Sequence, residues 1–128
     1  MIRADGIAWI VSLVAAAGAP VLMAVLGFSV KWGAHPWWDI KTALIGAAIG
    51  VVLFVVLEWL RPGLSFWVGL LVLVVAILVS SIGKSRFAAS FAEDAFAGKL
   101  WYFGWIGIAA GLAMLAGQVR HGIRRVLR

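Results

Sequence analysis

The sequence predicts an all-α membrane protein with four transmembrane helices, on three observations. Hydrophobic residues make up 65% of the chain and charged residues only 12%, whereas soluble domains carry about 25% charged residues. Four apolar runs are each long enough for the roughly 20 residues that a helix needs to cross a bilayer. The charged residues gather at the borders of these runs. This pattern excludes soluble enzymes, soluble nucleic-acid binders and disordered tails.

The runs cover residues 6–30, 42–60, 63–83 and 100–119, and together they predict a single domain over residues 1–128. In hydrocarbon every backbone N–H and C=O must be paired within the protein, so the runs are expected to be helices. Pro20 is expected to bend the first helix, because its nitrogen cannot donate a hydrogen bond. Arg61 and Pro62 form almost the whole connection between the second and third runs, which predicts an antiparallel hairpin.

The connection over residues 84–99 has a pattern of its own. On a helical wheel its Phe and Ala residues fill one half, and the polar residues fill the other half. This pattern predicts a short amphipathic helix that lies in the membrane interface before the fourth span. The alternative is a loop whose Phe side chains plug the mouth of the bundle.

Residues 119–128 predict a basic amphipathic tail on the cytoplasmic side. Its polar side carries Arg120, Arg124, Arg125 and Arg128. Basic residues beside a membrane attract anionic lipid headgroups, so these four arginines are predicted headgroup contacts. The net charge of +6 would also suit nucleic acid, but the position of the charges at span borders favours anionic lipids as the partner.

The basic residues also predict orientation. Along four spans, six Lys and Arg residues fall on the side of the two termini and five on the other side. The dense cluster over residues 119–128 favours cytoplasmic termini in a bacterial inner membrane. Trp residues flank the spans as an interfacial belt does. Trp37 and Trp38 are the least well explained by anchoring, and they are candidate residues for docking of a partner protein.

The spans offer little chemistry. The sequence has no Cys, and His35 and Asp39 share one loop but are too few for a metal site, which needs three or four ligands. His121 is expected across the membrane from them. Glu58 is predicted to pair with Arg61, which lies one helical turn away. No catalytic, cofactor or metal site is therefore predicted, and the chain is expected to be non-enzymatic.

Small residues give the clearest positive pattern. Gly46 and Gly50 lie four residues apart in the second run, as do Gly107 and Gly111 in the fourth. Such pairs let another helix approach closely. They predict helix packing, either inside the monomer or against another subunit.

These features favour a structural or accessory subunit that packs against other membrane subunits, and the partners expected for the chain are such subunits or a second copy of itself. A homo-oligomeric holin-like pore, or a small lipid or solute translocator, is the alternative, although its polar residues would need to form a stripe. A third hypothesis, an immunity or inhibitor protein for a membrane toxin, differs from the accessory subunit only in its partner.

Overall fold

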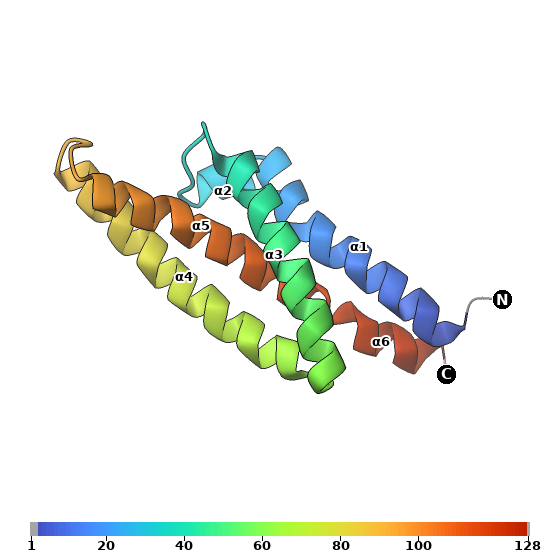
Figure 1. Cartoon of the computed structure of the whole chain (residues 1–128). Helices are drawn as coiled ribbons and strands as arrows, with labels where there is room; N and C mark the ends of the chain where they lie inside the picture. The colour runs from blue at the N-terminus through green and yellow to red at the C-terminus, as the bar shows by residue number, and fades with distance from the viewer. Residues whose placement is uncertain (1–2, 128) are drawn as a thin grey trace.

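A computed structural model describes residues 3–127, and this part of the chain forms six helices (Figure 1). They are α1 (Ala4–Val25), α2 (Phe28–Lys31), α3 (Asp39–Leu60), α4 (Leu64–Ala89), α5 (Ala95–Ala116) and α6 (Val119–Val126). The four-span prediction is confirmed, because α1, α3, α4 and the α5–α6 segment are each long and apolar enough to cross a membrane. The fold is consistent with a multi-pass membrane protein.

The ends of the helices differ from the expected spans. α1 includes Pro20 and ends at Val25 rather than at residue 30. The cause is Gly27, which adopts a left-handed φ of 87° that glycine tolerates without strain. α4 continues past residue 83 to Ala89, and α5 begins at Ala95, before residue 100.

The separate interfacial helix predicted over residues 84–99 is not confirmed. Its first part extends α4, and its last part is the beginning of α5. Between them the chain reverses through Phe91 and Ala92, whose φ angles are 55° and 68°. Asp94 then caps α5 by accepting a hydrogen bond from the N–H of Ala97 at 3.0 Å. The amphipathic pattern is therefore shared between two helix ends.

α5 lies at the centre of the bundle. It packs along α4 as a hairpin, and it also contacts α3 and α1 (Figure 1). Among the described residues, α1 and α4 make at most marginal contact with each other. The bundle is consequently open along the side between α1 and α4.

Glycines bring α3 close to α5. A Cβ added to Gly46 would lie 2.5 Å from the carbonyl oxygen of Ile106, and one added to Gly50 would lie 2.6 Å from that of Ala110. No side chain larger than hydrogen fits without a shift of the backbone. The two helices therefore approach as closely as small residues allow in a membrane.

Glycines of α5 face α4 in the same way. A Cβ on Gly107 would lie 2.8 Å from the Cβ of Ala76, and one on Gly111 would lie 2.9 Å from the Cβ of Leu73. The small-residue face predicted in the fourth run thus packs inside this chain.

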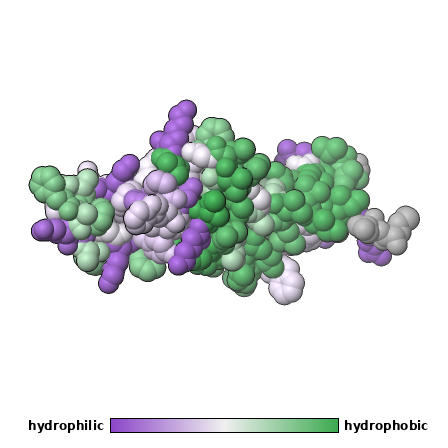
Figure 2. Space-filling view, turned by 90° about the horizontal axis from the view of Figure 1, so that it is seen from above, coloured by the Kyte–Doolittle hydropathy of each residue, from purple (hydrophilic) through white to green (hydrophobic). Residues whose placement is uncertain are grey.

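The bundle has two distinct ends. We call the end that contains the start of α1, the 61–63 turn and α6 the terminal end, and the end that contains residues 26–38 and 90–94 the loop end (Figure 1). In the space-filling view strongly apolar side chains cover the middle and much of the right side of the visible face, and hydrophilic side chains gather mainly in the left half, with a few at the right end (Figure 2). This distribution suits a molecule whose middle lies in hydrocarbon.

Candidate functional site

A buried charge network at the terminal end is the candidate functional site. Its centre is Glu58, near the end of α3, whose side chain is 0% exposed. One carboxylate oxygen, Oε1, accepts a hydrogen bond from the hydroxyl of Ser65 at 2.6 Å. The N–H of Gly63 donates to the same oxygen at 3.2 Å. These bonds fasten the turn between α3 and α4.

The other carboxylate oxygen of Glu58 faces α6. Nη1 of Arg120 donates to Oε2 at 3.1 Å. Nε2 of His121 lies 3.2 Å from the same oxygen, but without hydrogen-bond geometry, so this buried nitrogen has no hydrogen-bond partner among the described residues. Glu58 therefore joins α3, α4 and α6 at one point.

Arg120 connects the network to α1. The residue is only 7% exposed, and its guanidinium carbon lies 4.2 Å from the ring centre of Trp9, a favourable cation–π contact. Its Nη2 is 3.6 Å from Oδ1 of Asp5, and Nε of Arg124 lies 3.2 Å from the same oxygen. Two guanidinium groups and two carboxylates are thus arranged so that their charges balance.

Gln118 extends the network to the junction of α5 and α6. Its Nε2 donates to the hydroxyl oxygen of Ser65 at 2.6 Å and to the carbonyl of Met114 at 2.9 Å. The Ser65 hydroxyl accepts from Gln118 and donates to Glu58, so one side chain links both. Neither Ser65 nor Gln118 was expected from the sequence, although Gln118 is the only glutamine in the chain.

The partner of Glu58 differs from the one predicted. Arg61 is exposed beyond the end of α3, and the salt bridges of Glu58 in the described chain are with Arg120 and His121. Arg61 was predicted because it lies three residues, or one helical turn, after Glu58. The buried carboxylate instead faces α6, where it accepts a hydrogen bond from Arg120 and lies beside the ring of His121.

The predicted role of the arginines on α6 needs a similar correction. Arg120 is buried against Glu58 and is not a lipid-headgroup contact. Arg124 is partly exposed and pairs with Asp5, Arg125 is exposed, and Arg128 lies outside the described residues. Because ionised groups near hydrocarbon are costly unless they are paired, α6 turns much of its charge inward.

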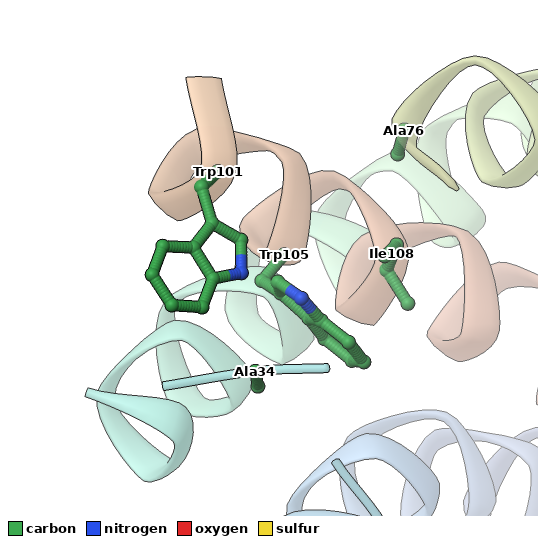
Figure 3. Packing of buried hydrophobic residues seen from close by; sticks show 5 residues of the cluster. All are labelled: Ala34, Ala76, Trp101, Trp105 and Ile108. Carbon is green, nitrogen blue, oxygen red and sulfur yellow. The ribbon is translucent and has the colours of Figure 1, made fainter. Parts of the chain in front are cut away.

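Aromatic side chains pack together at the loop end. The indole N–H of Trp101 donates to the carbonyl of Gly33 at 2.8 Å. The ring of Trp38 meets that of Trp101 edge-on, with 5.2 Å between ring centres, and His35 stacks on Trp38 at 5.9 Å. Figure 3 shows Trp101 projecting from α5 beside the loop that carries Ala34. This cluster ties the loop to α5.

The candidate docking pair is divided between two environments. Trp38 packs in the aromatic cluster, whereas Trp37 is 91% exposed. The backbone N–H of Trp37 donates to Nδ1 of His35 at 3.1 Å, which holds the loop in place. Within residues 3–127, no group of three or more His, Cys, Asp or Glu side chains could hold a metal ion.

The outer side of α1 carries a small-residue face that is open at Gly18. A Cβ added to Gly18 would find no heavy atom within 4 Å. Ala15, Gly18 and Ala19 line a shallow apolar groove of about 620 Å³ that extends to Ala116 and Val119. The face was not expected from the sequence, although Ala15 and Ala19 have the same four-residue spacing as the glycine pairs.

Comparisons with protein-family models, with curated proteins and with solved structures give no match to this chain.

Proposed function

We propose that this chain is a non-enzymatic accessory subunit of a membrane complex, and that α1 docks on a transmembrane helix of a partner subunit. The observation that supports this proposal is the outward small-residue face of Ala15, Gly18 and Ala19. The four glycines expected from the sequence face helices of the same chain. The face on α1, in contrast, is available to a partner.

Physical chemistry favours a helix as the occupant of this face. Lipid tails and apolar side chains are equally hydrophobic, so burial alone does not drive association in a bilayer. Close packing does, and a face of Gly and Ala lets two backbones come together. The charge network supports a structural role for the rest of the molecule, because its carboxylates are already paired with arginines.

Substitution of Gly18 by Leu tests the docking face. A Cβ at position 18 meets no heavy atom of the chain within 4 Å, so the Leu side chain can enter the groove without displacing the backbone, and Leu favours insertion into a membrane. We expect Gly18→Leu to fold normally and to lose its partner in co-purification from native membranes. Ala17→Leu is the matched control, because Ala17 is exposed on the same helix outside the groove. If both variants retain every partner, α1 is not the docking surface.

The same experiment separates a partner subunit from a second copy of the chain. Cross-linking from position 18 should capture a different protein. Capture of the same chain alone would overturn the accessory proposal and favour a homo-oligomeric pore or translocator. Trp37, exposed at the loop end, is a second point at which we propose contact with a partner.

We also propose that both termini lie in the cytoplasm and that the membrane is a bacterial inner membrane. The support is the six-to-five division of basic residues and their concentration in residues 119–128. A reporter fused after residue 128 should give a cytoplasmic signal. A periplasmic signal would reverse the orientation and leave the docking face unaffected.

A further inference from the structure

A second apolar groove lies on the side where α1 and α4 do not meet. It has a volume of about 340 Å³, and it shares no lining residue with the α1 groove. Its floor is formed by Ile108 and Leu112 of α5, and Leu73 and Ile77 of α4 form one wall. Ile77 is 46% exposed, so the groove opens toward the lipid.

The lining residues disfavour a helix as the occupant. Neither Gly nor Ala lines the groove, and its apolar walls are Leu, Ile, Met and Trp side chains. A helix backbone cannot come close to such a surface. A thin and flexible hydrocarbon chain can lie between these side chains and contact them along its length.

The length of the groove matches one leaflet. Its lining on α4 runs from Leu73 to Ser81, which corresponds to roughly 12 Å of helix. Half of a hydrocarbon core that is about 30 Å thick is about 15 Å. An occupant of this length reaches from the interface to the middle of the bilayer and does not span it.

The groove becomes polar at the loop end, and two lysines lie close in sequence to its lining residues. Ser80, Ser81 and Trp32 line this part, and Lys84 follows one turn later on α4. Nζ of Lys84 lies 5.8 Å from the ring centre of Trp101, and none of the salt bridges within residues 3–127 involves it. Lys31, next to Trp32, is also exposed. Hydroxyl, indole and ammonium groups at an interface complement an anionic phosphate.

We propose that this groove binds one acyl chain of an anionic phospholipid from the leaflet at the loop end, with the lipid phosphate beside Lys84. The apolar chain fills the opening between α1 and α4. The lipid thereby completes the side of the bundle that the protein leaves open. This inference does not depend on the docking role of α1.

Native mass spectrometry of the purified protein, titrated with phosphatidylglycerol or phosphatidylcholine, tests the groove. We expect the wild-type protein to retain one phosphatidylglycerol in preference to phosphatidylcholine. Ile77→Trp should fill the groove and reduce this binding at least fivefold. Leu78→Trp is the matched control, because Leu78 is exposed on the same helix but does not line the groove. Equal binding by the two variants would overturn the proposal.

Replacement of Lys84 by Gln tests the headgroup contact. A Lys near a membrane surface contributes about fivefold to binding of an anionic lipid. Lys84→Gln should therefore abolish most of the preference for phosphatidylglycerol and leave acyl-chain binding intact. Arg86→Gln removes the same charge at the same end and should retain the preference, because Arg86 is exposed on another side of α4, about 200° around the helix from Lys84. Identical losses in both variants would show general charge attraction and overturn the assignment to Lys84.

Quenching of tryptophan fluorescence by brominated lipid tests the proposal without a variant that fills the groove. Trp105 lines the groove and is 6% exposed. In vesicles of phosphatidylglycerol with brominated acyl chains, wild-type fluorescence should fall further than that of Trp105→Phe. An unchanged quenching ratio in Trp105→Phe would mean that no acyl chain enters the groove.

Discussion

The terminal end and the loop end both join three or more segments of the chain, but they do so with different chemical groups. At the terminal end, Glu58 and Arg120 form a buried ion pair that links α3 to α6. At the loop end, Trp38 and Trp101 pack as rings, with a single indole hydrogen bond to Gly33. The first end relies on few strong and mutually dependent contacts, and the second relies on many weak ones.

The comparison shows where each kind of contact is vulnerable. A buried ion pair contributes little net stability, but the loss of one partner leaves an uncompensated charge. Aromatic packing has no such dependence, since each ring pair contributes about 0.5–1.5 kcal/mol beyond its burial. Single substitutions should therefore damage the terminal end more than the loop end.

The largest effect is expected for Glu58→Gln. Arg120 would keep its charge in a buried position without a carboxylate, which destabilises the fold by roughly 3–5 kcal/mol. The change in the free energy of unfolding is measured in a single detergent, with circular dichroism as the signal. Glu93→Gln is the control, because Glu93 is exposed in the 90–94 turn. Equal stability of the two variants would show that the network does not hold the terminal end.

An intermediate effect is expected for Ser65→Ala. The substitution removes the hydroxyl that donates to Glu58 and accepts from Gln118, and it leaves buried polar groups unpaired at about 1–3 kcal/mol. The same unfolding experiment, with exposed Ser85→Ala as control, measures this loss. A double variant with Glu58→Gln should lose less than the sum of the single variants, because the two residues share one bond. Additive losses would argue against the shared hydroxyl.

At the loop end, Trp101→Phe keeps most of the ring and removes the N–H that donates to Gly33. We expect a loss of about 1 kcal/mol and faster amide exchange over residues 33–38. Trp37→Phe, at an exposed ring, should change neither quantity. A loss as large as that of Glu58→Gln would contradict the distinction between the two ends.

The smallest effect is expected for Asp5→Asn. Asp5 contacts Arg120 and Arg124, but its side chain is 55% exposed. Water screens such a pair, so the loss should not exceed about 1 kcal/mol. Glu58 pairs with the same Arg120 but is buried, so a larger loss of stability in Glu58→Gln than in Asp5→Asn is attributed to burial. A loss comparable with that of Glu58→Gln would mean that the terminal end is shielded from solvent.

Hydropathy predicts the spans because apolar length is a local property of the sequence. The four runs become helices long and apolar enough to cross a membrane, and the spacing of Gly46 and Gly50 indicated close packing. Which helix the glycines meet was not predictable, because the pattern describes only one of the two surfaces. The ends of α4 and α5 do not emerge from the pattern, because the apolar periodicity over residues 84–99 continues across the turn that separates the two helices.

The charge network was missed for a different reason. A helical wheel assigns Arg120 to a polar side, and beside a membrane that side is taken to face headgroups. Its actual partner is Glu58, 62 residues earlier, and no local pattern reports so distant a contact. The local pattern therefore predicts Arg61, the nearest basic residue, as the partner of Glu58. Whether a charged residue near a span faces lipid headgroups depends on whether an oppositely charged residue elsewhere in the chain can pair with it.

This separation also bears on the order of events during synthesis. Glu58 leaves the ribosome 62 residues before Arg120, an interval on the order of 3–12 s at ordinary rates of translation. Throughout that interval the carboxylate of Glu58 lacks its partner, because Arg120 has not yet been synthesised. The hairpin of α3 and α4 can form earlier, because Gly63 and Ser65 supply its first hydrogen bonds. A chain that stops before residue 120 would keep the hydrogen bonds from Gly63 and Ser65 but would leave the carboxylate of Glu58 without its arginine.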